Sequence, residues 1–389
     1  MTTTDTVVRL LGGDFPAQQF GRTYRHWKGV GDFADLLTWD DLNAIVSRNR
    51  LEPPRLRLSA DGDMIPQHVY TTAVTTRRNT IWHRIEPSRM HAQLADGASL
   101  VLDAADEIHP RVGQFAEALE RHFQAGVQVN AYASWTPREG FGIHWDDHDT
   151  VVVQLEGAKR WRIYGQTRSD PLYRDTEAPE APTGEPLTEL VLRAGDMLYM
   201  PRGWWHAVGA VEGRSLHLTC GIKSTTGSDL ITWIGERVRA SDAVRATLPI
   251  HASPSEQAAY LDVLRKEIVA ALHDGVIPEY MAAGDGIDVG RPAPSLPNVE
   301  SIPADPALKV RFTTARARVH TNADGQTVLA AGGEEWILAS QAHGVLAPLV
   351  EGESLTIGEL SDRSGLPLDQ VAELLTAFVA ADFAAVGHL

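Results

Sequence analysis

The sequence predicts an α+β protein that combines a β-rich domain, a helical region and a small mixed module. Short apolar runs separated by Gly, Pro and Asp fill residues 1–226, as expected for strands joined by turns. No regular alternation of strands with helices is visible, which favours an antiparallel barrel or sandwich over a doubly wound fold. Apolar residues at helical spacing dominate residues 227–298, and residues 299–389 combine helix and strand patterns.

Composition narrows the class of protein. The 389 residues are 43% hydrophobic and 22% charged, as in a soluble globular protein with more than one domain. The single cysteine, Cys220, excludes an internal disulfide and a cysteine-rich metal site, and it fits a reducing compartment. No apolar run is long enough to span a membrane, and no secretory signal is visible, so we expect a cytoplasmic protein. The net charge of −16 opposes general binding to nucleic acid or anionic lipid and favours a basic partner.

Within the β-rich domain, the pattern predicts individual strands. Two apolar runs flank Glu156-Gly157 and predict two strands joined by a tight turn. The strands expected in this domain are Val151–Leu155, Ala158–Tyr164, Leu187–Leu192, Asp196–Met200 and Ser215–Ile222.

The helical pattern extends from Ser228 to Met281, and a Gly- and Pro-rich linker follows over Gly284–Pro303. One apolar stripe stands out because its residues recur every three or four positions: Tyr260, Leu261, Leu264, Ile268 and Leu272. Such a stripe either packs on its own domain or forms a dimer contact.

Beyond the linker, we expect helices over Glu334–Val350, Ile357–Ser364 and Pro367–Val379, and a short extended segment at Phe383–Val386. Helix, turn, helix and strand in this order suggest a winged-helix module. Five basic and eleven acidic residues lie between Ser301 and Leu389, and the second helix of the pair has no Lys or Arg. A DNA-reading helix needs the opposite charge, so we expect a structural or protein-binding module and no direct DNA binding.

Two motifs predict a metal site. The first is Gly142-Ile-His144-Trp-Asp146, in which residues two apart on a strand point to the same face. The second is Gly195-Asp-Met-Leu-Tyr-Met-Pro201-Arg-Gly203-Trp-Trp-His206, in which Pro and Gly shape a turn that delivers a histidine. Two histidines and one carboxylate leave coordination positions open, the facial arrangement associated with non-haem Fe(II) oxygenases. His148 competes as a ligand, but three ligands on one short strand cannot easily surround an ion.

These motifs resemble the JmjC-type oxygenases of the cupin superfamily, in particular the ribosomal-oxygenase branch. The resemblance also includes Asn130-Ala-Tyr132-Ala-Ser134-Trp, Gln154-Leu-Glu-Gly157-Ala-Lys159-Arg-Trp161-Arg and an N-terminal aromatic segment, Phe20–Trp27. It implies three domains: a JmjC/cupin double-stranded β-helix barrel over residues 1–226, a helical dimerisation region with its linker over 227–298, and a winged helix over 299–389. It therefore also implies a homodimer.

The resemblance implies Fe(II), 2-oxoglutarate and O₂ as cofactor and cosubstrates. Lys159 would bind the distal carboxylate of 2-oxoglutarate, because a cosubstrate with two carboxylates needs a cation opposite the metal. We expect Lys159 on a strand that pairs beside the strand after the His-X-Asp motif. The further candidates near the cosubstrate are Tyr132, Asn130, Ser134, Thr136 and His217.

The implied function is hydroxylation of a polypeptide side chain, with a histidine or arginine of a basic ribosomal protein as the target. The sequence differs from the family at His148, where an apolar or aromatic residue is expected, and this leaves the substrate open. Hydroxylation of a biosynthetic peptide or small molecule is one alternative. A metal cupin that does not use 2-oxoglutarate is another, and a cupin sensor that regulates transcription through the winged helix is a third.

Overall fold

A computed structural model describes residues 3–79, 81–172, 179–288 and 290–387 of the chain. The chain divides into two compact units, Met1–Lys223 and Ser224–Leu389. Among the described residues, no helix combines the length and the apolar character needed to cross a membrane.

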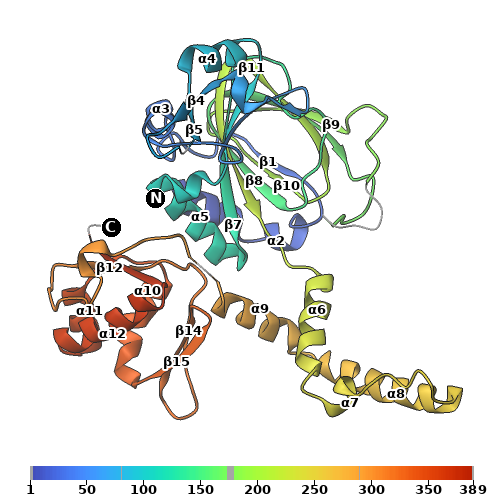
Figure 1. The fold of residues 1–389 in the computed structure, drawn as a ribbon, viewed down its shortest axis with the longest axis vertical. Helices are drawn as coiled ribbons and strands as arrows, with labels where there is room; N and C mark the ends of the chain where they lie inside the picture. The colour runs from blue at the N-terminus through green and yellow to red at the C-terminus, as the bar shows by residue number, and fades with distance from the viewer. Residues whose placement is uncertain (1–2, 80, 173–178, 289, 388–389) are drawn as a thin grey trace. The chain divides into compact units, whose positions relative to one another are not determined.

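The first unit is built around a nine-stranded antiparallel sheet that curls into a barrel (Figure 1). The order of hydrogen-bonded strands is β1-β10-β8-β11-β7-β6-β2-β3, and β9 pairs with the free side of β8. The strands are β1 (Arg25–Trp27), β2 (Leu56–Ala60), β3 (Asp63–Met64), β6 (Ser99–Leu102), β7 (Val127–Ser134), β8 (Asp149–Gly165), β9 (Thr188–Arg193), β10 (Met197–Met200) and β11 (Trp205–Ile222).

Strands β8 and β11 are the longest, and they pair with each other along both halves of their length. The tight turn expected at Glu156-Gly157 was wrong, because Val151–Leu155 and Ala158–Tyr164 belong to one continuous strand. Gly157 has a φ of +69°, and a register shift in β11 between Val211 and Leu216 faces it. The glycine therefore marks a bend in a long strand, which a sequence pattern cannot distinguish from a turn without the partner strand.

Helices cover one side of the barrel and share its core. Helix α5 buries Phe115 and Leu119 in the same apolar cluster as Val129 of β7 and Leu218 of β11. Five helices and a separate two-stranded ribbon accompany the sheet: α1 (Thr3–Leu10), α2 (Phe15–Gln18), α3 (Trp39–Arg48), α4 (Pro87–Ala95), α5 (Pro110–Phe123), and the ribbon of β4 (Thr71–Thr75) and β5 (Ile81–Ile85).

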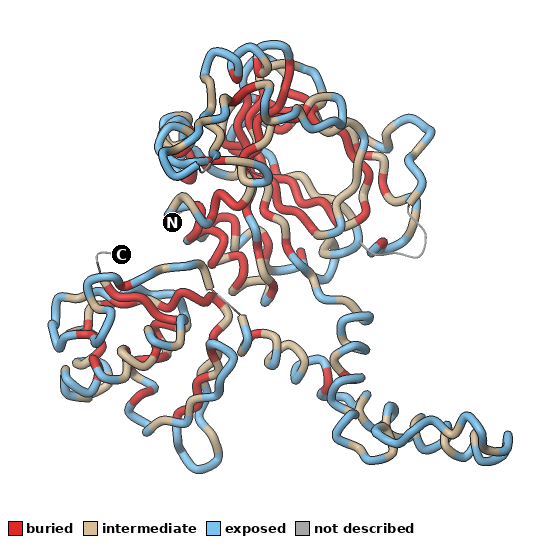
Figure 2. Tube along the Cα trace, viewed as in Figure 1, coloured by how far each residue is buried: buried red, intermediate tan, exposed pale blue. Residues whose placement is uncertain are grey.

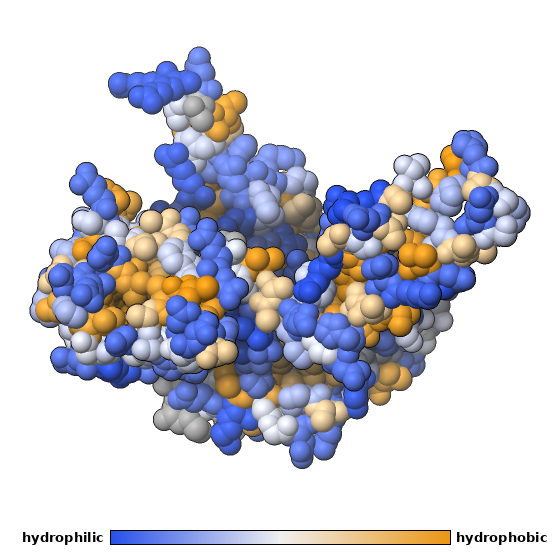
Figure 3. All heavy atoms as spheres, turned by 90° about the horizontal axis from the view of Figure 1, so that it is seen from below, coloured by the Kyte–Doolittle hydropathy of each residue, from blue (hydrophilic) through white to orange (hydrophobic). Residues whose placement is uncertain are grey.

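The second unit begins with the predicted helices, α6 (Gly227–Val238), α7 (Asp242–Arg245), α8 (Pro254–Ala271) and α9 (Val276–Gly286). No residue of α8 is buried by the described parts of the chain, as the absence of red along this helix in Figure 2 shows. Leu261, Ile268 and Leu272 of the predicted stripe are between 44% and 49% exposed. Hydrophobic side chains interrupt the hydrophilic surface of this region in Figure 3. The Tyr260 hydroxyl donates to the carbonyls of Ala243 (3.1 Å) and Ala246 (3.3 Å), so one end of the stripe packs on the α7 segment, while Leu261, Ile268 and Leu272 remain exposed.

The rest of the second unit has its own core of aromatic and aliphatic side chains, including Phe312, Phe378 and Phe383. Its elements are β12 (Lys309–Phe312), β13 (Arg318–Thr321), β14 (Thr327–Ala331), β15 (Glu334–Leu338), α10 (His343–Val350), β16 (Leu355–Thr356), α11 (Ile357–Ser364), α12 (Leu368–Ala380) and β17 (Ala384–Gly387).

This module matches the predicted order of helix, turn, helix and strand at α11, α12 and β17. The helix expected over Glu334–Val350 was wrong in its first part. Gly332 and Gly333 both have positive φ and form a turn that sends Glu334–Leu338 back along β14 as an antiparallel strand.

Gly157 provides a test of the bent strand. A Cβ at Gly157 would lie 2.0 Å from the carbonyl oxygen of Arg214, and its φ is unfavourable for any other residue. Gly157→Ala should lower the free energy of unfolding by about 3 kcal/mol, measured by urea denaturation. Gly213 also has positive φ, but no atom lies within 4 Å of a Cβ there, so Gly213→Ala should cost about 1 kcal/mol. Equal losses for both variants would contradict the close approach.

Candidate metal and cosubstrate site

Three backbone hydrogen bonds join the two halves of the predicted metal motif. The amide of His144 donates to the carbonyl of His206 (3.0 Å), and the amide of His206 donates to the carbonyl of His144 (2.8 Å). The amide of Gly203, in the turn before His206, donates to the carbonyl of Asp146 (2.9 Å). His144 forms only an isolated bridge, and Asp146 lies in the loop before β8. The strand expected for this motif was therefore wrong, but the loop still brings the residues together.

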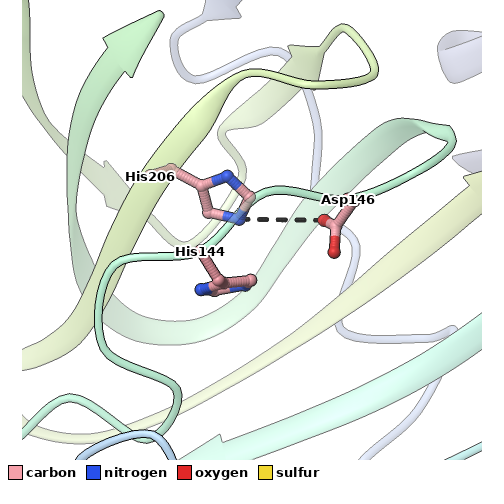
Figure 4. A group of neighbouring side chains, drawn as sticks. All are labelled: His144, Asp146 and His206. Atoms are coloured by element: carbon pink, nitrogen blue, oxygen red, sulfur yellow. Dashed lines mark ion pairs between the residues drawn. The ribbon is translucent and has the colours of Figure 1, made fainter. Parts of the chain in front are cut away.

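The side chains of His144, Asp146 and His206 converge on one point (Figure 4). Their candidate ligand atoms all lie within 4.8 Å of one another, and Nε2 of His206 is 3.7 Å from Oδ2 of Asp146. Each histidine Nδ1 is hydrogen-bonded to a nearby carbonyl, of Gly142 (3.1 Å) and of Trp204 (2.9 Å). A carbonyl accepts only from N–H, so the proton lies on Nδ1 and the Nε2 lone pair of each ring is available to a metal.

Burial keeps the imidazole of His206 neutral, the protonation state in which a histidine can bind a metal. The side chain is 3% exposed, and burial together with the charge of His144 lowers the pKa of His206 to about 4. Trp161 of β8 stacks on the ring of His206, with 5.5 Å between centroids. The imidazole is thus neutral at pH 7 and fixed in orientation.

A pocket opens beside the three side chains and extends into the barrel. It is lined by Ser99, Tyr132, Gly140, Phe141, His144, Asp146, Thr150, Lys159, Trp161, His206, Val208, His217 and Thr219. Six of the nine residues predicted for the site, His144, Asp146, His206, Lys159, Tyr132 and His217, are in this lining.

Lys159 contributes a buried amine to the lining of this pocket. It is 3% exposed, and within the described ranges no hydrogen bond or ion pair to its ammonium group is found. Burial lowers the pKa of Lys159 to about 7. The lysine lies on β8, the strand that directly follows the His-X-Asp motif, and not on a neighbouring strand as expected. A buried cation without an anion is costly, which indicates that the pocket is built for an anionic ligand.

Two further polar atoms in the lining lack a partner among the described residues: Nδ1 of His217 and Nε1 of Trp161. Burial and the charge of Lys159 hold the pKa of His217 well below its ordinary value. The ring of Tyr132 stacks on that of His217, with centroids 5.0 Å apart and planes within 6°. Burial and the charge of Asp146 raise the pKa of Tyr132, so its hydroxyl stays neutral and can donate. Several donors and one cation therefore face the same space.

The remaining predicted residues lie next to the lining without being part of it. The Asn130 amide oxygen accepts from the amide of Ala104 (2.9 Å), and the Ser134 hydroxyl pairs with Ser99 (2.8 Å). Thr136 accepts from the amide of Arg138. Their roles toward a cosubstrate stay predictions.

His148 lies outside the group formed by His144, Asp146 and His206. Its ring pairs with Asp147 (2.9 Å) and packs over Gly221, where a Cβ would lie 2.6 Å from the ring.

Sequence reasoning missed Ser99, Phe141, Thr150 and Thr219. Thr150 and Thr219 lie on β8 and β11, and polar residues in otherwise apolar strands could have indicated a lined cavity. Ser99 and Phe141 come from distant segments and carry no local signal.

The fold and site geometry agree with the comparisons with known proteins. Residues 104–230 match the family model described as "JmjC domain". This confirms the family resemblance expected from the two motifs, because the matched range contains His144, Asp146, Lys159 and His206.

Two curated relatives illustrate the similarity. The chain is 38% identical to Ribosomal oxygenase 1 of Gallus gallus over 215 residues, which is 52% of this chain and 34% of that protein. It is 32% identical to the bifunctional lysine-specific demethylase and histidyl-hydroxylase NO66 of Dictyostelium discoideum over 227 residues, 56% of this chain and 42% of that protein. The chain thus matches well under half the length of these relatives.

The fold of nearly the whole chain resembles that of YcfD, a ribosomal oxygenase from Escherichia coli. The structure of that protein in complex with cobalt and 2-oxoglutarate aligns with a TM-score of 0.60 and 19% identity, covering 96% of this chain and 97% of that chain. The predicted α+β architecture with a JmjC/cupin barrel is confirmed at the level of the fold.

Lys159 provides a test of the anion pocket. Because burial lowers its pKa from 10.5 to about 7, the unfolded chain binds more protons than the folded chain between those pH values. The free energy of unfolding therefore rises with pH across this window. Lys159→Met should stabilise the metal-free protein at pH 7, and the gain should shrink as the pH approaches 10.5.

Urea denaturation at several pH values measures this difference. Lys223 is exposed, so Lys223→Met should show no such dependence on pH. A Lys159→Met variant less stable than the parent at pH 7 would show that Lys159 has an anionic partner in the free protein.

Proposed function

We propose that this protein is an Fe(II)- and 2-oxoglutarate-dependent oxygenase that hydroxylates a side chain of a ribosomal protein. The observation that carries the proposal is the buried, unpaired ammonium group of Lys159 in the same pocket as His144, Asp146 and His206. A metal at the three side chains and a cation deeper in the pocket fit a ligand with a carboxylate at each end. A cupin that uses only a metal has no need for this cation.

The donor set fits ferrous iron. Two neutral imidazoles and one carboxylate form the facial arrangement that leaves positions for a bidentate ligand and a gas molecule. When bound, Fe(II) and 2-oxoglutarate supply the oxidising chemistry: O₂ is consumed, 2-oxoglutarate becomes succinate and CO₂, and one oxygen atom enters a C–H bond.

The protein's own residues orient the ligands and exclude water. Lys159 would bind the distal carboxylate of 2-oxoglutarate, and the hydroxyl of Tyr132 would donate to the same group. The stacked rings of Trp161 and His206 keep one side of the site dry.

The names of the relatives support a polypeptide substrate. Ribosomal oxygenase 1 and the histidyl-hydroxylase are similar to 52% and 56% of this chain, respectively. A basic ribosomal protein also suits a chain with a net charge of −16, because opposite charge accelerates encounter. The target in this proposal is a histidine or arginine side chain.

The charge of the C-terminal module disfavours a transcriptional regulator. Helix α12 would be the recognition helix, and it exposes Asp369 and Glu373. These carboxylates would repel a phosphate backbone.

The test is oxidation of a ribosomal-protein panel by the purified enzyme with Fe(II) and 2-oxoglutarate. We expect stoichiometric succinate and a gain of about 16 Da, the mass of one oxygen, on a single residue. His144→Ala and Asp146→Ala should abolish both signals, whereas His148→Ala should retain them because His148 is outside the group. Lys159→Ala should raise the required 2-oxoglutarate concentration at least tenfold, and Lys159→Arg should be milder.

Three results would contradict parts of this proposal. Product formation without succinate would remove 2-oxoglutarate from the reaction. Oxidation of free amino acids or small molecules alone would favour a biosynthetic role. Loss of activity in His148→Ala together with full activity in His206→Ala would replace one proposed ligand by the other.

We also propose that the chain forms a homodimer through α8. Leu261, Ile268 and Leu272 of the stripe are exposed, and no residue of α8 is fully buried by the described parts of the chain. Burying each aliphatic side chain contributes roughly 1.5–3 kcal/mol, so a self-complementary contact would be favourable.

Replacing Leu264 and Ile268 together by glutamate should convert the dimer to a monomer, because the charges would be buried without partners. Light scattering measures the mass, and circular dichroism checks that the helices remain. Leu187 is 69% exposed and lies in the first unit, so Leu187→Glu is a matched control that should remain dimeric. A monomeric parent would end this proposal.

A further inference from the structure

Exposed arginines gather on the β4–β5 ribbon and at the end of α3, although the chain as a whole is acidic. Residues 48–84 carry seven arginines against three acidic residues, in a chain with a net charge of −16. Arg48, Arg50, Arg77 and Arg78 are exposed, and no ion pair to any of them is found in the described part of the chain. With Trp82, these four arginines form what we name the basic ribbon patch.

Two members of this patch are in direct contact. The guanidinium of Arg50 lies 4.6 Å from the centre of the Trp82 ring. Next to it, the carboxylate of Glu52 accepts the backbone amide of His83 (2.8 Å) and thereby ties the segment after α3 to the ribbon. Trp82 is paired with Val74 of β4, and Arg77 and Arg78 lie in the turn that follows this strand.

The ribbon has no evident role within the fold. Its two strands are not hydrogen-bonded to the nine-stranded sheet, and most of their residues are exposed or half-exposed. Arg84, by contrast, is paired with Glu86 (3.0 Å). Arg50 stacked on Trp82, together with three further exposed arginines that have no ion pair among the described residues, points to an external polyanion.

We propose that the basic ribbon patch binds RNA. Guanidinium groups match phosphate oxygens, and a half-exposed indole with a stacked arginine offers a surface on which an unpaired base can stack. An anionic membrane is the less favourable partner, because Ile81 is the one strongly exposed large aliphatic side chain among the described residues of the ribbon.

This inference rests on the proposed function only for the choice of ribosomal RNA as the probe. A ribosomal protein is surrounded by RNA, so a second contact on the catalytic unit would raise the effective concentration of the target residue at the pocket. The patch itself is defined by its own residues and requires neither metal nor cosubstrate.

The test is fluorescence anisotropy of the full-length, metal-free protein with a labelled single-stranded ribosomal RNA fragment at several salt concentrations. Arg77→Glu/Arg78→Glu should weaken binding at least tenfold and flatten the plot of log affinity against log salt by about 1.4, since two phosphate contacts are lost. Trp82→Ala should weaken binding about tenfold, and Trp82→Phe should restore most of it. The matched control is Arg9→Glu/Arg22→Glu, which makes the same change in net charge at two exposed arginines outside the patch.

These outcomes test RNA binding separately from the proposed oxygenase activity. Turnover of a short isolated peptide should be unchanged in Arg77→Glu/Arg78→Glu, so loss of RNA binding with intact peptide oxidation supports the patch. Equal weakening by the control pair would show that overall charge, not the patch, sets the affinity. Tight binding to phosphatidylserine vesicles with the same dependence on Arg77 and Arg78, and none to RNA, would assign the surface to membranes and overturn the proposal.

Discussion

The reciprocal hydrogen bonds between the backbones of His144 and His206 are the constraint on which the site depends. They join a loop before β8 to the start of β11, two segments more than sixty residues apart, at the mouth of the barrel. The third bond, from Gly203 to the carbonyl of Asp146, fixes the loop that carries the carboxylate. Because both histidines also donate Nδ1–H to neighbouring carbonyls, the position and the tautomer of each ring are set by backbone groups. The metal-binding geometry is thus a property of the folded chain before any ligand enters.

Strand β8 connects the loop that carries Asp146 to Lys159 in the anion pocket. One strand begins directly after the carboxylate loop, turns at Gly157 and then presents Lys159 and Trp161 to the barrel interior. Strand β11 follows the same course and presents His206 before its register shift and His217 after it. The separation between the proposed metal and the cation is therefore set by two continuous, hydrogen-bonded strands rather than by loops. Such a support suits a site in which two ends of one ligand must be reached at once.

The sequence predicted the chemistry of the site better than its local structure. His144, Asp146 and His206 converge as expected because the spacing of Pro201 and Gly203 specifies a turn, and α11 has the predicted limits because Thr356 and Gly365 cap it. The turn at Glu156-Gly157 could not be distinguished from a bend, since that depends on a partner strand sixty residues away. Asn130 and Ser134 have the predicted alternation, but the groups that bond them, Ala104 and Ser99, come from elsewhere in the chain. Lys159 has no carboxylate partner because of how distant segments pack in the fold, and the spacing of residues in the sequence does not reveal this.

Because the pKa of Lys159 is lowered, binding of a carboxylate ligand in this pocket is coupled to uptake of a proton by Lys159. Burial lowers the pKa of Lys159 to about 7, so this amine gives up its proton more readily than an exposed lysine does. A carboxylate that enters the pocket restores the charged form, so association draws protons from the solvent. Apparent affinity then declines as the solution becomes alkaline, and the heat of association varies with the ionisation enthalpy of the buffer. Acidification would strengthen capture of a carboxylate ligand, a sensitivity to acidity that a permanently charged arginine would not provide.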